Sequence, residues 1–346
     1  MKKIYFLILE MLFFALLVFS LAYRDLMEYG WMQGKGQLEI YFEAKPISAV
    51  LQNKNVPDSL KKKLILVQEI RQYAIDSLGI NNSKNFTSLY NQHGKPSLWV
   101  LTASEKFSLK TKVWSFPFLG SVSYKGFFDE EKGKFAKNKL QNEGYDTDLG
   151  TVADWSTLGW LSDPILSNTL SFPIGDLSNI IIHELTHGTL YVKNNVDFNE
   201  NLASFIGDKG AVKFLIHQYG IDSPEYLQYE HHKADRKLYA DYILKSAARL
   251  DSLYKQFKPN ESVAEKEAEK MNLIQSIVAN VSELNLYNKA KYIKYSQDAF
   301  KSKNAFFIAF KMYDSQYDYF DKELHQKFGN NLRNYLDYLK KKYPNI

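Results

Sequence analysis

Three residues of one short segment have the types and spacing of a metal-dependent hydrolase. His183, Glu184 and His187 spell H-E-x-x-H inside the apolar stretch IIIHELTHGTLYV. On an α-helix, residues four apart lie on one face, so both imidazoles can reach one Zn²⁺ at about 2.0 to 2.1 Å. Glu184 then lies roughly 100° further round the helix, where it can reach a metal-activated water but not the metal. The segment therefore predicts a Zn²⁺ cofactor with a general base beside it.

A third protein ligand must come from elsewhere, because a catalytic zinc site keeps three protein ligands and one open position. Glu200, in the stretch DFNENLASF, is the best candidate. The extended motif with a third histidine fails, because Leu190 and Lys193 occupy its Gly and His positions. The chain also has no cysteine that could supply a thiolate. We therefore predict His183, His187 and Glu200 as the metal ligands.

Glu200 also has a purely structural interpretation. Asp197 followed three residues later by Glu200 is a capping-box pattern, in which the glutamate accepts a hydrogen bond from the backbone N–H of the cap. The carboxylate cannot serve both purposes well, and two zinc-binding histidines need another donor. Ligation is the preferred prediction, and the capping box stays open as its alternative.

At these residues the chain resembles a known family, the predicted aminopeptidases of the gluzincin-like class. The pattern of that family is H-E-L-[AT]-H followed by a short turn and F-N-E. The resemblance covers most of the chain after the N-terminal segment and extends to YGWMQGKGQLEI near residue 30, VWSFPFLGSVSYKGFF (113–128), DWSTLGWLSDPIL (154–166) and NAFFIAFKMYDSQYDYF (304–320). The sequence departs from the pattern at Trp155, where the family often has Tyr, and at Lys303, which leaves only Asn304 of an Asn-Asn-Ala signature. The resemblance implies a zinc peptidase acting on peptides, with aminopeptidase activity expected and no particular substrate sequence.

The predicted chemistry is hydrolysis of peptide bonds by a metal-activated water, with Glu184 as the general base that later protonates the leaving amine. The tetrahedral oxyanion needs a hydrogen-bond donor opposite the metal. Tyr313, in the resembling C-terminal stretch, and Tyr124, beside a predicted edge strand, are the catalytic candidates for that role. Tyr191 follows His187 by one turn and is interpreted as a packing residue.

Two other functions stay open at this point. One is a non-catalytic, membrane-tethered zinc-containing binding protein, which is disfavoured because a structural zinc site needs four protein ligands. The other is a membrane-anchored processing endopeptidase, which shares every catalytic residue named. An exopeptidase needs a carboxylate near the site to recognise the free α-amine, and Asp129, Asp154 and Asp163 are available.

Composition bounds the remaining possibilities. The chain has 346 residues, 45% of them apolar, and can bury a full core in one large domain or two lobes. A net charge of +5 is mild for this length, and no Lys/Arg cluster interleaves with aromatic residues, so no nucleic acid partner is expected. The 24 Tyr and 23 Phe residues are interpreted as core and packing. Composition does not indicate an oligomeric state.

The N-terminal segment, residues 1–24, is predicted to be a membrane anchor. Lys2 and Lys3 precede an apolar run from residue 4 to 22, interrupted by Glu10 and Ser20, which just reaches the roughly 20 residues that cross a bilayer. Positive charge before the run places that end in the cytoplasm and the catalytic domain outside. The alternative is a signal peptide cleaved after the small residues of Ser20-Leu21-Ala22, which gives a secreted or periplasmic protein.

The elements that must position the motif follow from periodicity. Residues 60–78 read as an amphipathic helix ending at Gly79. The stretches LWVLTA, KVWSFPF and GSVSYKGFF, within residues 98–128, read as short strands, and an edge strand from Val113 to Tyr124 is a candidate for pairing with a peptide backbone. From Ser223 and Pro224 the chain is helical. We expect a predominantly helical α+β fold: a transmembrane helix, then a metallopeptidase domain (25–346) with a zincin-like lobe containing a small sheet (25–220) and a helical lobe (221–346).

Overall fold

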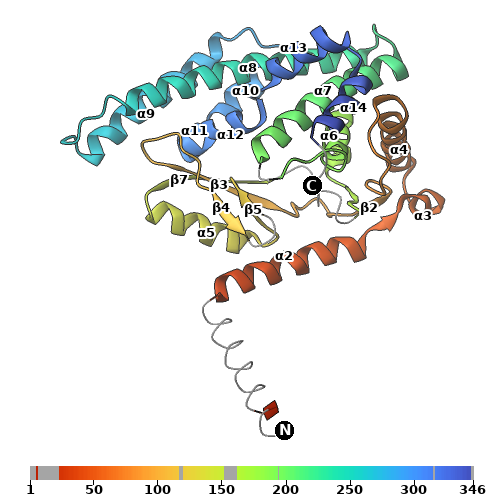
Figure 1. The fold of residues 1–346 in the computed structure, drawn as a ribbon, viewed down its shortest axis with the longest axis horizontal. Helices are drawn as coiled ribbons and strands as arrows, with labels where there is room; N and C mark the ends of the chain where they lie inside the picture. The colour runs from red at the N-terminus through yellow and green to blue at the C-terminus, as the bar shows by residue number, and fades with distance from the viewer. Residues whose placement is uncertain are drawn as a thin grey trace.

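The computed structural model describes residues 5–6, 23–116, 120–151, 162–193, 195–314 and 316–343. Most of these residues are helical, and short strands lie among the helices (Figure 1). The helices up to the end of the H-E-x-x-H motif are α2 (Arg24–Glu43), α3 (Ile47–Gln52), α4 (Asp58–Leu78), α5 (Glu130–Asn142), η1 (Thr169–Ser171) and α6 (Ile174–His187). Those after it are α7 (Val196–Tyr219), α8 (Pro224–Tyr254), α9 (Val263–Ala279), η2 (Asn280–Glu283), α10 (Lys289–Ser296), α11 (Ala299–Ser302), α12 (Asn304–Asp314), α13 (Tyr317–Phe328) and α14 (Leu332–Lys342).

The strands form three small sheets rather than the one expected. They are β1 (Lys45–Pro46), β2 (Ser88–Tyr90), β3 (Trp99–Glu105), β4 (Trp114–Phe116), β5 (Gly120–Val122), β6 (Lys125–Phe127), β7 (Tyr145–Thr151) and β8 (Ile165–Leu166). In the first sheet β2 pairs with β1 and, in parallel, with β8; in the second, β3 lies between β6 and β7 with antiparallel pairing; and β4 and β5 form a separate hairpin. Helices α5 and α12 pack on the sheet of β3 and lie on opposite sides of it in Figure 1.

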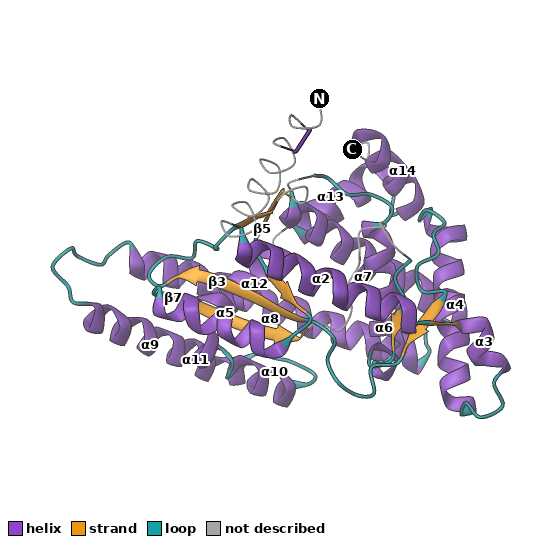
Figure 2. Ribbon diagram, turned by 90° about the horizontal axis from the view of Figure 1, so that it is seen from below, coloured by secondary structure: helices purple, strands orange, loops and turns teal. Residues whose placement is uncertain are grey.

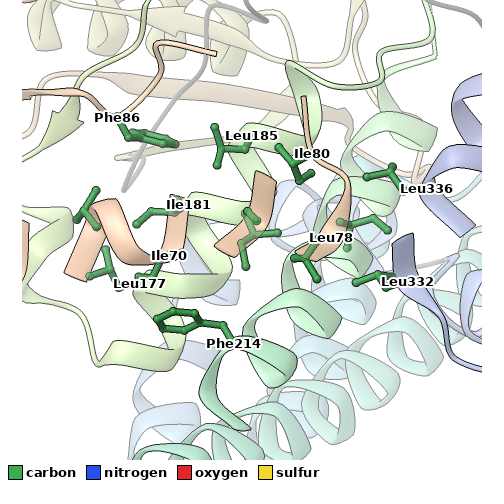
Figure 3. Packing of buried hydrophobic residues seen from close by; sticks show 14 of the residues in the cluster. Ile70, Leu78, Ile80, Phe86, Leu177, Ile181, Leu185, Phe214, Leu332 and Leu336 are labelled. Atoms are coloured by element: carbon green, nitrogen blue, oxygen red, sulfur yellow. The ribbon is translucent and has the colours of Figure 1, made fainter. Parts of the chain in front are cut away.

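The largest hydrophobic cluster surrounds the helix that carries the H-E-x-x-H motif. Helix α4 contributes residues three or four apart, including Leu64, Ile70 and Leu78, and α6 contributes Leu177 and Ile181 in the same way. These apolar residues of α4 and α6 pack against side chains from α7 and α14 (Figure 3). The periodicity that predicted a helix over residues 60–78 is confirmed by α4, which ends at Gly79 with φ +79°, a backbone conformation that favours glycine.

The C-terminal helices belong to the same cluster. Phe320 and Leu324 of α13, and Leu332 and Tyr335 of α14, are buried together with the residues of α4 and α6. A second cluster joins α8, α9 and α12 around buried residues such as Ile243, which packs among the side chains of those helices. The division into lobes at residue 220 stays a prediction.

The fold class predicted from the sequence is wrong in its first element. Among the described parts of the chain, no helix is both long enough and apolar enough to cross a membrane. The run from residue 4 to 22 lies outside the described residues, apart from Tyr5 and Phe6. Helix α2, which follows it, carries charges along its length and runs from the sheet of β3 toward α3 (Figures 1 and 2). The fold is therefore a mostly helical α+β chain with small sheets, and the location outside the cytoplasm stays a prediction.

Candidate metal centre

Helix α6 presents its two histidines on the side opposite its apolar stripe. The helix begins at Ile174 after Pro173, and Leu177, Ile181 and Leu185 are buried in the main cluster. The two histidines fall between these positions, and a Cβ atom on Gly207 of the following helix would lie 3.2 Å from Cβ of His183, so this face is turned toward that helix. The two Nε2 atoms of His183 and His187 are 3.1 Å apart, so the two rings converge on one point.

Helix α7 brings Glu200 to the same point. It begins at Val196, and the side chain of Asn195 caps it by accepting a hydrogen bond from the N–H of Phe198 at 3.3 Å. Glu200 therefore lies beyond the position that a capping box with Asp197 would require. One carboxylate oxygen of Glu200 is 3.5 Å from Nε2 of His183 and 3.6 Å from Nε2 of His187.

The three donor atoms have the separation that a zinc ion requires. In a tetrahedral site with bonds of about 2.0 to 2.1 Å, neighbouring ligand atoms lie about 3.3 Å apart. The observed separations of 3.1, 3.5 and 3.6 Å lie on either side of that value. Within the described parts of the chain, this is the one group of His, Cys, Asp and Glu side chains that could hold a metal ion. Two imidazoles and a carboxylate also match the known ligands of catalytic zinc.

Glu184 lies beside this group without joining it. Its Oε1 is 3.9 Å from Nε2 of His183, and its side chain is only 13% exposed. A carboxylate that close to the donor atoms, yet on a different face of the helix, can accept a proton from a water molecule held between them. The role of Glu184 as the general base stays a prediction.

The surroundings shift the pKa values of the three donor groups in different directions. Burial by itself would raise the pKa of the Glu200 carboxyl, but its contacts with His183 and His187 outweigh burial and hold that pKa well below its usual range. Burial lowers the pKa of His183, which favours its neutral form. Burial acts in the same direction on His187, but its contacts with the carboxylate of Glu200 outweigh burial and raise its pKa. An ionised carboxylate and a neutral imidazole are the forms that coordinate metals.

A close helix crossing holds the ligands together. A Cβ atom on Gly207 of α7 would lie 2.9 Å from the carbonyl oxygen of Asn179 and 3.2 Å from Cβ of His183. Only glycine allows α6 and α7 to approach this closely next to His183. The connecting turn is fixed by Asn199, whose side chain accepts a hydrogen bond from the N–H of Val192 and donates one to its carbonyl, both at 2.8 Å.

The structure places two tyrosines near the centre. Tyr124 lies between β5 and β6, and burial raises its pKa, with further contributions from Glu200, Tyr191 and Glu184. Tyr191 also has a pKa raised by burial and by the charge of Glu200. Its proximity was not expected, because a residue after the end of α6 has no helical register that could reveal it. Tyr313 belongs to α12, but its side chain is outside what the structure describes.

The three carboxylates considered for the α-amine have different surroundings. Asp129 caps α5 by accepting a hydrogen bond from the N–H of Lys132 at 3.0 Å, and it is exposed. Asp163 is buried, and one of its oxygens accepts a hydrogen bond from Asn85 at 3.4 Å. Asp154 lies outside the described residues. The assignment of an α-amine ligand stays open.

Comparison with known proteins agrees with the resemblance of the motifs. A protein family described as "Putative aminopeptidase" matches residues 28–342, which run from within α2 to the end of α14 and include the candidate metal centre. The chain belongs to this family. No curated protein and no solved structure matches the chain.

Proposed function

We propose that the protein is a zinc-dependent aminopeptidase with a gluzincin-like centre. The observation that carries the proposal is the convergence of His183, His187 and Glu200 from two helices, with Glu184 beside them. The family match supports an aminopeptidase rather than a processing endopeptidase. A purely structural zinc would require a fourth protein ligand, and within the described residues only three such side chains come together.

His183, His187 and Glu200 would hold the ion. When bound, zinc supplies Lewis-acid chemistry, polarising the scissile carbonyl and lowering the pKa of water toward 7. Glu184 accepts a proton from the attacking water as the oxygen–carbon bond forms. It then donates that proton to the amine nitrogen as the carbon–nitrogen bond breaks, so the carboxylate returns to its starting state.

Tyr124 is the residue that we assign to the developing oxyanion. Its burial and its interactions with Glu200 and Glu184 favour the protonated phenol, the form that can donate a hydrogen bond. It lies next to the β4–β5 hairpin, where an extended peptide can pair with a strand edge. Tyr313 remains a second candidate for the same role.

Two substitutions distinguish the residue that binds zinc from the residue that catalyses hydrolysis. Glu184→Gln keeps the shape of the site but removes the base, so we expect about one zinc per chain and a loss of peptide hydrolysis of about 10²- to 10⁴-fold. Glu200→Ala removes a ligand, so we expect zinc affinity to fall by more than the roughly 10- to 100-fold that loss of an outer-shell partner costs. Zinc binding is followed by the metal content of each protein, and catalysis by hydrolysis of peptides with free amino ends.

Glu131→Gln, on the exposed surface of α5, is the matched control and should behave as the wild type. Unchanged hydrolysis in Glu184→Gln would overturn the mechanism. Full zinc retention in Glu200→Ala would overturn the ligand assignment.

A further inference from the structure

A cavity of about 700 Å³ lies between the motif helix and the helices that follow it. Its walls come from α6, α7, α8 and α13, which lie close together in Figure 1. A volume of this size is typical of sites for small organic ligands. Neither the metal ligands nor Glu184 are among the residues that line it, so it is a space additional to the candidate metal centre.

The cavity is aligned with the metal centre along both helices. Ile180 of α6 lines the cavity and precedes Glu184 by four residues, and Ser204 of α7 lines it and follows Glu200 by four. Residues four apart share one face of a helix and are separated by about one turn, or about 5.4 Å. The cavity therefore begins about one turn from the reacting centre.

Its far wall lies within reach of a short peptide. Asp176 of α6 is seven residues from His183, and Asp208 of α7 is eight residues from Glu200. At about 1.5 Å per helical residue, these distances are about 10 to 12 Å. Since an extended peptide advances about 3.3 Å per residue, about three residues span the distance from the scissile bond to that wall.

The residues that line the cavity change from uncharged to charged with increasing distance from the candidate metal centre. Near the centre, Ile180, Asn179 and Ser204 are uncharged. Further away, Arg236 of α8 donates to Asp176 at 2.8 Å and to Asp208 at 3.3 Å. The side chain of Arg236 is 40% exposed. The far wall thus offers paired charges that can bind the polar backbone and end of a peptide.

We propose that this cavity binds the leaving part of the peptide substrate, up to about three residues beyond the scissile bond. The inference rests on the proposed aminopeptidase function, because such an enzyme releases one residue from the amino end and several residues remain only on the leaving side. The preferred substrates are then peptides of four or more residues, rather than dipeptides or single aminoacyl amides.

A pair of alanines on α8 gives a matched test. Ala234 lines the cavity and is exposed, whereas Ala248 is also exposed but lines a separate surface hollow. Because neither alanine is in the core, Ala234→Trp and Ala248→Trp should both fold, which circular dichroism checks. Each is combined with Glu184→Gln so that the zinc-loaded protein binds a tetrapeptide with a free amino end without cleaving it.

Calorimetry should show at least tenfold weaker tetrapeptide binding for the Ala234→Trp protein and unchanged binding for the Ala248→Trp protein. Equal affinities in the two proteins would overturn the cavity assignment. With Glu184 intact, Ala234→Trp should still hydrolyse an aminoacyl amide but should lose the advantage of the tetrapeptide over it. If the wild type cleaves neither substrate while Ala234→Trp still blocks binding, the proposed function fails and the cavity assignment stands.

Discussion

His183 and His187 point at one position because they are four residues apart on a helix whose opposite face is buried. That part of the site could be predicted from the sequence, since an i, i+4 pair needs only a helix to bring it together. Glu200 could be predicted because two zinc-binding histidines need another donor and the chain has no cysteine to supply one. The tyrosines could not be ranked in the same way: Tyr124 and Tyr191 approach Glu200 through tertiary packing, which no local pattern encodes.

At the residue scale, Tyr124→Phe tests the oxyanion donor. Loss of one such donor costs about 10² to 10³ in kcat, and we expect that fall with KM and zinc content nearly unchanged, because the phenol is not a ligand. Tyr191→Phe serves as the comparison, since that phenol also lies near Glu200. Steady-state kinetics on one peptide measures both. Wild-type kcat in Tyr124→Phe, or a large fall only in Tyr191→Phe, would move the role to another residue.

At the scale of elements, the site is the crossing of α6 and α7. A helix at the motif followed from the apolar stretch that contains it, and the strands near residues 99–127 followed from their β-branched and aromatic content. Their division into three sheets did not, because strand partners are set by contacts distant in sequence. The role of Gly207 also could not be predicted, since a glycine in a helix shows its purpose only when the neighbouring helix is in place.

Gly207→Ala tests this crossing. The added Cβ would meet the carbonyl of Asn179, so we expect a destabilisation of about 1 to 3 kcal/mol from overpacking and weaker zinc binding as α6 is displaced. Gly30→Ala in α2 is the control, because a Cβ there meets nothing within 4 Å. It should be neutral or stabilising by up to about 1 kcal/mol. Urea unfolding and zinc titration give the two readouts, and equal effects of the two substitutions would refute the packing argument.

At the scale of the whole molecule, a buried ion pair joins the sheet to the C-terminal helices. Lys270 of α9 is fully buried and donates to Asp146 of β7 and to the carbonyl of Lys106. Asp146 also accepts a hydrogen bond from the N–H of Asn304 at the start of α12. Burial raises the pKa of Asp146 and lowers that of Lys270, so both groups depend on each other to remain charged.

Removing one partner of this pair should therefore be costly. Lys270→Met leaves Asp146 buried without its cation, and we expect a loss of about 3 to 5 kcal/mol of folding stability. The double variant Lys270→Met with Asp146→Leu should recover most of it, because no uncompensated charge then remains. Lys289→Met, at an exposed position of α10, is the control. Chemical denaturation measures all three, and a stable single variant would show that the junction does not depend on the pair.

The whole-molecule prediction from the sequence was weakest at the N-terminus. The apolar run from residue 4 to 22, followed by a mostly polar chain, predicted a transmembrane helix. That prediction of a membrane span was based on hydropathy alone. The described helices, including α2, are too polar or too short for such a span. The packing of α13 and α14 against α4 likewise had no sequence signal, since it joins segments more than 200 residues apart.

The location of the metal tests the account most directly. Anomalous diffraction at the zinc absorption edge, from crystals of the zinc-loaded protein, should show one strong peak between Nε2 of His183, Nε2 of His187 and the carboxylate of Glu200, with Glu184 beside it and not bound. A peak located only elsewhere in the molecule, or no peak among these three side chains, would contradict the proposed zinc centre.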